Sequence, residues 1–125
     1  MSKGKKKVLV LCVDRDNDIG VKTRIKTPIV GRDDNLEVAS KLALIDPEES
    51  DANAIFGAVK VYDSLSSESD SGAYQIATIA GSELGGIEAD RQLRDQLLGV
   101  LSQFPSDSIV LVTDGFSDEE VLPII

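Results

Sequence analysis

The sequence predicts an α/β fold with three layers and a short, mainly parallel sheet, and two features lead to that prediction. Residues 8–13 and 109–113 are continuous aliphatic runs, which is typical of strands buried on both faces of a parallel sheet. Segments with the periodicity of amphipathic helices lie between the apolar runs. The resulting order, β-α-α-β-α-β, indicates a single Rossmann-like domain spanning residues 1–125.

The first half of the chain is predicted to contain one strand, a long loop and two helices. The strand at residues 8–13 follows a basic tail at residues 1–6. Residues 16–32 are polar, contain glycine and proline and show no sustained periodicity, so they predict a long loop that forms part of a site. Helices are predicted over residues 36–45 and 52–65. Their expected N-caps are Asp34 or Asn35 for the first helix and Ser50 or Asp51 for the second.

The second half of the chain is predicted to alternate strands with one helix. A buried strand over residues 74–80 is followed by a glycine-rich turn at residues 81–86 and an amphipathic helix at residues 87–104. The strand at residues 109–113 comes next, and the apolar residues 121–125 are compatible with a further strand. If the first strand lies between the other two, its carboxyl end is next to that of the strand at residues 109–113.

Composition excludes several classes of function. The net charge of −9 argues against nucleic-acid binding, which needs a basic surface. The chain has no histidine, so Ser-His-Asp catalysis and ordinary zinc sites are excluded. Cys12 is the single cysteine, so no disulfide forms within the chain and a reducing, cytoplasmic location is expected.

Aspartates at the ends of two predicted strands suggest a metal site. Asp14, Asp16 and Asp18 alternate directly after the first strand, and Asp114 follows the strand at residues 109–113. Ligands of open α/β sheets bind outside the carboxyl ends of the strands. Clustered carboxylates suit a hard cation, so we expect these residues to bind Mg²⁺ as a cofactor. The alternative is that the same aspartates only cap turns.

Cations and a glycine-rich turn suggest recognition of a small phosphorylated ligand. The predicted loop carries four basic residues directly after the aspartates: Lys22, Arg24, Lys26 and Arg32. Gly81 begins a strand-to-helix turn whose backbone N–H groups could hold an anion. The alternatives are a solvated loop and an ordinary turn.

Six segments together resemble the archaeal domain of unknown function 373 family, in matching order along essentially the whole chain. They are residues 12–18, Gly20, and residues 25–28, 50–54, 77–81 and 111–115. The resemblance implies that this chain is the N-terminal part of a longer protein whose C-terminal portion spans the membrane several times. The domain would then lie on the cytoplasmic face of that membrane. The family has no established activity, so the resemblance implies no chemistry.

The family motifs coincide with the predicted strand ends and complete the candidate site. The residues that the motifs add as ligand-binding candidates are Lys26, Thr27, Asp51 and Asn53. The favoured hypothesis is a ligand-binding domain that reports to its own membrane segments. The alternatives are a metal-dependent phosphoryl-transfer or hydrolase domain, and an interaction module, such as a homodimer, without a metal site.

Overall fold

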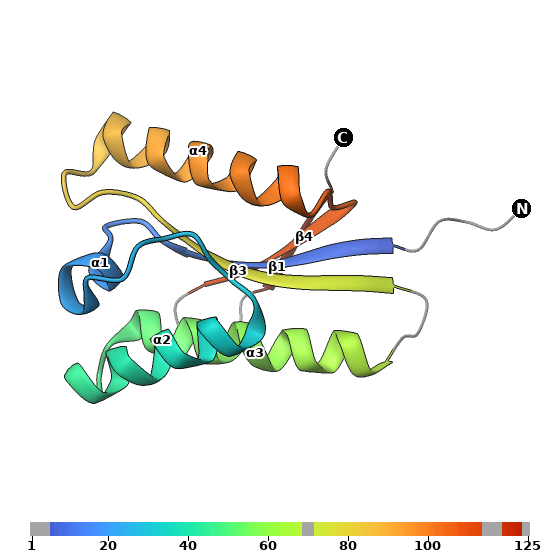
Figure 1. Cartoon of the computed structure of the whole chain (residues 1–125), viewed down its shortest axis with the longest axis horizontal. Coiled ribbons are helices and arrows are strands. Elements are labelled where there is room, and N and C mark those ends of the chain that lie inside the picture. Colours follow the sequence, from blue (N-terminus) through green and yellow to red (C-terminus); the bar gives the residue numbers. More distant parts are fainter. Residues whose placement is uncertain (1–5, 69–71, 114–118, 124–125) are drawn as a thin grey trace, which may run out of the picture.

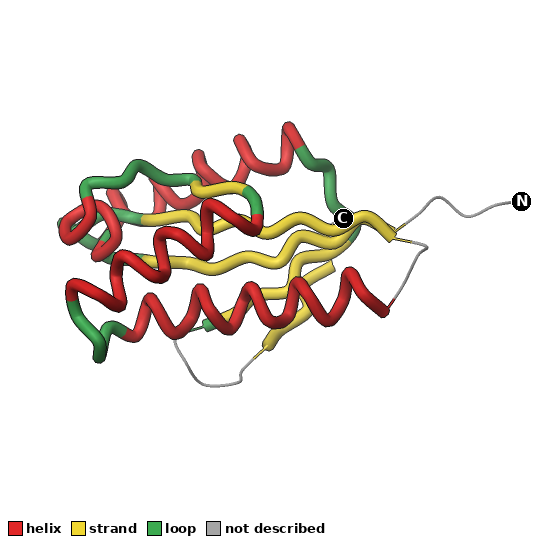
Figure 2. The backbone as a smooth tube through the Cα atoms, turned by 60° about the horizontal axis from the view of Figure 1, so that its bottom comes forward, coloured by secondary structure: helices red, strands yellow, loops and turns green. Residues whose placement is uncertain are grey.

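The computed structural model describes residues 6–68, 72–113 and 119–123, which form one five-stranded sheet with helices on both faces (Figures 1 and 2). The elements in chain order are β1 (Lys6–Asp14), α1 (Asp18–Thr23), β2 (Ile29–Val30), α2 (Arg32–Ile45), α3 (Ser50–Glu68), β3 (Gly72–Ala80), α4 (Gly86–Gln103), β4 (Ser108–Val112) and β5 (Glu119–Pro123). The predicted α/β class and mainly parallel sheet are confirmed.

Strand β1 lies at the centre of the sheet, whose order is β2-β3-β1-β4-β5. It pairs in parallel with β3 on one side and with β4 on the other, and Asp14 is in register with Ala80. The predicted position of the first strand between the other two is therefore confirmed. Both edge strands are antiparallel to their neighbours. The carboxyl ends of the three parallel strands consequently meet at one edge of the domain.

The aliphatic run of β1 explains the three layers, because its alternate side chains pack against helices on opposite faces. Leu9 and Leu11 belong to the cluster beneath α4, whereas Val10 and Cys12 belong to the cluster beneath α2 and α3. Figure 1 shows α4 on one side of the sheet and α2 with α3 on the other. The core is aliphatic, as expected for a chain in which aromatic residues make up 4%.

The prediction of a long loop over residues 16–32 was wrong, because this segment contains α1 and β2. Asn17 and Arg24 cap the two ends of helix α1, and both residues have left-handed backbone conformations, with φ of 60° and 61°. Strand β2 is only two residues long and pairs with β3. Elements this short show no hydrophobic periodicity. The predicted basic tail also ends one residue early, because Lys6 is the first residue of β1.

The expected caps of α2 were also wrong. This helix begins at Arg32, after Gly31 with φ of 102°, and no side chain caps it. Asn35 is instead fully buried inside the helix, where its amide donates to the carbonyls of Ile29 and Gly31. Its oxygen accepts a hydrogen bond from the Thr78 hydroxyl of β3. Asn35 therefore holds α2, β2 and β3 together.

The start of α3 differs from the prediction by a few residues. Ser50 is the first residue of the helix, and the Glu49 carboxylate accepts a hydrogen bond from the Asp51 N–H at 3.2 Å.

Among the residues that the structure describes, no helix is both long enough and apolar enough to cross a membrane.

Candidate metal centre

Asp14 joins three parts of the chain at the carboxyl end of β1. Its side chain is buried, with 2% of the residue exposed. The carboxylate accepts hydrogen bonds from the N–H groups of Asp18 at 3.1 Å and Ile19 at 2.8 Å. The Asp14 carbonyl accepts another from the N–H of Gly81 at 2.9 Å. Asp14 thus fixes the start of α1 and the turn between β3 and α4.

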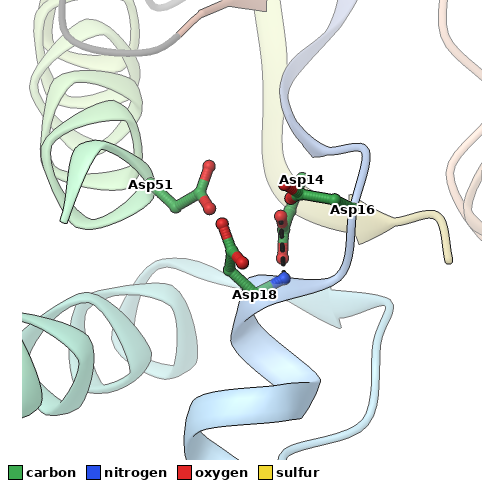
Figure 3. A group of neighbouring side chains, drawn as sticks. All are labelled: Asp14, Asp16, Asp18 and Asp51. Carbon is green, nitrogen blue, oxygen red and sulfur yellow. Dashed lines mark hydrogen bonds between the residues drawn. The ribbon is translucent and has the colours of Figure 1, made fainter. Parts of the chain in front are cut away.

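The structure brings the carboxylates of Asp14, Asp16, Asp18 and Asp51 together, and we call this group the aspartate cluster. One oxygen from each residue lies within 4.8 Å of one oxygen from each of the others. Figure 3 shows Asp51 reaching from the start of α3 toward Asp18, with Asp14 and Asp16 beside them. The cluster joins segments separated by more than thirty residues in sequence through the packing of α3 against the sheet.

Burial and mutual repulsion make these carboxyl groups weaker acids than usual. Burial raises the pKa of Asp14 to about 6, although the N–H groups of Ile19 and Asp18 partly oppose this rise. Burial and then the charge of Asp14 raise the pKa of Asp51 to about 8. Burial is also the largest cause of the raised pKa of Asp18. With a pKa of about 8, Asp51 holds a proton at neutral pH, whereas Asp14, with a pKa of about 6, is mostly ionised.

The oxygen positions fit a hard divalent cation. Oxygens on opposite sides of Mg²⁺ lie about 4.2 Å apart, and those on opposite sides of Ca²⁺ about 5 Å apart. No separation within the cluster exceeds 4.8 Å, so the four oxygens are close enough together to surround one such ion. In the described part of the chain, none of the four carboxylates forms an ion pair with lysine or arginine. The chemistry of the donor set therefore matches a cation.

A cavity of about 380 Å³ adjoins the aspartate cluster, and we call it the acidic cavity. Asp16, Asp18 and Asp51 line it on one side. The remaining polar lining comes from the side chains of Arg15, Ser50, Ser82, Glu83 and Thr113. Arg15 is fixed by an ion pair with Asp90 of α4 at 2.7 Å. The cavity thus combines carboxylates with hydroxyl groups and one guanidinium group.

Lys26 and Thr27, which were predicted to belong to one site with the aspartates, do not line the acidic cavity. Together with Arg24 and the amide side chains of Asn17 and Gln96, they line a cavity of about 500 Å³, which we call the basic cavity. The other two predicted cations pair with carboxylates: Lys22 with Asp46 and Glu49, and Arg32 with Asp63. The four basic residues of this segment therefore do not form one phosphate site.

The remaining predicted site residues have separate positions. Asn53 is exposed on α3 and does not line either cavity. Gly81 is buried in the turn after β3, where its N–H binds the carbonyl of Asp14 and not a ligand. Asp114 lies outside the described residues. Cys12 is buried near Asp14 and Asp51, and burial raises the pKa of its thiol to about 12, so it remains protonated.

The sequence interpretation missed Glu49, which connects Asp51 of the aspartate cluster to helix α1. Its side chain is buried, pairs with Lys22 of α1 and accepts from the N–H of Asp51. Lys22 precedes Glu49 by 27 residues, so no local pattern reveals this pair. A glutamate directly before a helix was the one signal in the sequence that could have drawn attention to it.

Comparisons with known proteins identify relatives without a described activity. The family model described as "Domain of unknown function (DUF373)" matches residues 7–125. An uncharacterized protein of Archaeoglobus fulgidus is 40% identical over 119 residues, covering 95% of this chain and 34% of the relative. An uncharacterized protein of Methanocaldococcus jannaschii is 42% identical over 122 residues, covering 95% of this chain and 32% of the relative. The chain therefore spans about a third of the length of these curated relatives. No solved structure matches it significantly.

Proposed function

Since the chain belongs to the DUF373 family, whose description states no activity, its function has to follow from its own site, and we propose that the domain binds a divalent cation together with a small anionic ligand. Mg²⁺ is the first candidate for the cation. The observation that carries this proposal is the convergence of four carboxylates, from β1, the turn after it, α1 and α3, without a basic partner among the described residues.

The cost of burying Asp14 supports a cation at this position. A buried carboxylate is unfavourable unless it is hydrogen-bonded or paired with positive charge. Two backbone N–H groups satisfy one lone pair on each Asp14 oxygen, and each oxygen retains further acceptor capacity. A cation among the four aspartates would supply the missing positive charge and lower their raised pKa values.

The lining of the acidic cavity supports an anionic ligand beside that cation. Mg²⁺ in proteins is commonly held by carboxylates on one side and by water or substrate phosphates on the other. Arg15 and the hydroxyl groups of Ser50 and Ser82 line the cavity and are suitable donors to such an anion. Gly85, the N-cap of the 18-residue helix α4, also lines it and offers no side chain to cap that helix. Because no side chain caps α4, the first N–H groups of this helix are available to donate to an anion.

Cation binding is tested by titrating Mg²⁺, Mn²⁺ and Ca²⁺ into the domain, with backbone amide NMR shifts as the readout. We expect saturable shifts near residues 14–18 and at the start of α3. Asp51→Asn should weaken binding at least tenfold, because it removes one ligand charge while leaving the hydrogen bonds of Asp14 intact. Asp51 is preferable to Asp14 for this test because Asp14 also holds α1.

Asp95→Asn is the matched control, because Asp95 is an exposed carboxylate on α4. It removes the same charge from a residue that lines neither cavity. Its affinity for the cation should equal that of the unmodified domain. An equal loss of affinity in both variants would show that the cation is held only by general electrostatic attraction. The absence of saturable shifts with all three ions would refute the proposal.

Metal-dependent phosphoryl transfer or hydrolysis is the second candidate, and one observation favours it. Arg15 lines the acidic cavity beside the carboxylates, and a guanidinium group at this place could stabilise the charge on a phosphoryl group during its transfer. Phosphate release from p-nitrophenyl phosphate in the presence of Mg²⁺ or Mn²⁺ would distinguish an enzyme from a binding domain. Release that is unchanged in Asp51→Asn would exclude a reaction that depends on a cation at the aspartate cluster.

The membrane attachment of the full-length protein is also part of the proposal. Its support is the resemblance to the family, together with the two thirds of each relative that this chain does not cover. Fractionation of the full-length protein should place it with membranes, and protease treatment of sealed vesicles should find this domain on the cytoplasmic face. Recovery of the full-length protein in the soluble fraction would refute attachment.

A homodimeric interaction module without a metal site is the remaining hypothesis if the domain binds neither a cation nor an anion.

A further inference from the structure

The basic cavity shares helix α1 and Glu83 with the acidic cavity but differs from it in charge. Its lining comes from α1 and the residues after it, from the turn between β3 and α4, and from α4 itself. Arg24 and Lys26 contribute two positive charges to this lining, and Glu83 contributes one negative charge. This balance is unusual in a chain with a net charge of −9.

The cations of the basic cavity are not neutralised within the described residues. Arg15, Lys22, Arg32 and Lys41 each lie within ion-pair distance of a carboxylate. In the same part of the chain, Arg24 and Lys26 make no such pair, although both line one cavity. The backbone of Arg24 is held in place because its N–H donates to the carbonyl of Gly20 at 2.9 Å. Arg24 and Lys26, two residues apart, thus present positive charge to the same space.

Two amide side chains in the lining are oriented as hydrogen-bond donors. The Asn17 Oδ1 accepts the N–H of Gly20 at 3.1 Å, and the Gln96 Oε1 accepts the N–H of Ala80 at 3.0 Å. Because each oxygen is used within the protein, each NH₂ group is left to donate. A third amide, Gln92, also lines the cavity, but its NH₂ group donates to the carboxylate of Glu88 at 3.5 Å.

From this arrangement we propose that the basic cavity binds the phosphate group of a small molecule. A phosphate carries close to two negative charges at neutral pH and only acceptor oxygens, which match two cations and the NH₂ donors. The planar guanidinium of Arg24 pairs well with two phosphate oxygens, and Lys26 acts as a point charge. A volume of about 500 Å³ accommodates a small molecule beyond the phosphate itself. The observations that support this site do not depend on the cation proposed at the aspartate cluster.

The test is a titration of inorganic pyrophosphate into the domain in the presence of EDTA, again followed by backbone amide NMR shifts. EDTA removes divalent cations, so the aspartate cluster cannot recruit the probe. We expect saturable shifts at α1, at residues 24–27 and at Gln96. The double variant R24Q/K26Q should weaken binding at least tenfold, and each single variant should weaken it by an intermediate factor.

The matched control is R91Q/R94Q, which removes two exposed positive charges from α4 outside the basic cavity. It should retain the affinity of the unmodified domain within about twofold. Equal weakening by the two double variants would show that pyrophosphate responds only to overall charge and would overturn the proposal, as would shifts that do not saturate. Asp51→Asn should leave pyrophosphate binding in EDTA unchanged, so that failure of the cation site and failure of this site give different results.

Discussion

Gly81 occupies a position where the backbone itself excludes a side chain. A Cβ atom at this residue would lie 2.2 Å from the carbonyl oxygen of Arg15, a distance that no side chain tolerates. The close approach lets the N–H of Gly81 reach the carbonyl of Asp14. We therefore predict that Gly81→Ala destabilises the domain by about 2–4 kcal/mol, because the two backbone segments must separate. The midpoint of urea denaturation measures this change.

Gly99→Ala is the control for that substitution. Gly99 lies in the exposed part of α4, and nothing surrounds the position that its Cβ would take. Alanine should stabilise the helix here by about 0.5–1 kcal/mol. Destabilisation of both variants by similar amounts would show that the contact at Arg15 is not the cause.

The raised pKa values of Asp14 and Asp51 predict how stability depends on pH when no cation is bound. In the folded domain these values are about 6 and about 8, compared with an ordinary value of 3.8. The folded state therefore binds more protons than the unfolded state between pH 4 and pH 8. The contribution of these two groups to the free energy of unfolding should be highest below about pH 4. It should fall as the pH rises from 4 to 8.

Urea denaturation in EDTA at several pH values measures that dependence, and Asp51→Asn isolates the contribution of one residue. The variant should lose less stability than the unmodified domain between pH 5 and pH 8. Identical pH profiles would contradict the prediction. Adding Mg²⁺ to the unmodified domain should restore stability at high pH, because a cation favours the ionised carboxylates.

The residues of the aspartate cluster were foreseeable to different degrees. Asp14, Asp16 and Asp18 were predicted because strand ends in α/β sheets are usual ligand positions. Asp51 was suggested by the family motif alone, since its approach to Asp14 depends on how α3 packs on the sheet. Lys26 and Thr27 were predicted to join the aspartates but lie in the basic cavity, because α1 turns the chain away after Asp18.

At the scale of elements, Asn35 is the side chain that connects α2 to the edge of the sheet. Replacing it by alanine leaves the carbonyls of Ile29 and Gly31 and the hydroxyl of Thr78 without their buried partner. Each such loss costs about 1–3 kcal/mol, so we predict that Asn35→Ala destabilises the domain by about 3 kcal/mol or more. Chemical denaturation measures the loss.

Asn53→Ala provides the comparison, because Asn53 is an exposed residue inside α3. Its replacement should change stability by no more than about 0.5 kcal/mol. A small effect at Asn35 would mean that water replaces the missing amide, and the structural role assigned to this residue would then be wrong.

Elements with a strong pattern were predicted and elements with a weak pattern were not. The aliphatic runs of β1, β3 and β4 identify buried strands, and the apolar positions of α3 and α4 identify helices. In contrast, α1 and β2 depend on tertiary contacts and on the left-handed conformation of Asn17. Asn35 misled the assignment of the helix start, because a residue type that favours caps is used here for long-range hydrogen bonds.

For the molecule as a whole, the strand order predicts a gradient of local stability across the sheet. Strand β1 is paired on both sides, whereas β2 is a two-residue strand at the edge. We predict that amide protons of Leu9 and Leu11 exchange with solvent only through global unfolding, and that the amide of Val30 exchanges much faster. Hydrogen exchange followed by NMR measures both, and equal protection of β1 and β2 would contradict the assigned order.

Helix α1 contributes residues to both cavities, and this has a consequence for how their ligands influence one another. It contributes Asp18 to the acidic cavity and Gly20 to the basic cavity. Six residues are too few for a stable isolated helix, so its position depends on Asp14 and on the pairing of Lys22 with Glu49. A cation bound at the aspartate cluster would order this helix. An anion that then binds in the basic cavity would cause a smaller further loss of conformational entropy, so its affinity would be higher. Thermodynamic reciprocity then requires the anion to raise the affinity for the cation by the same factor.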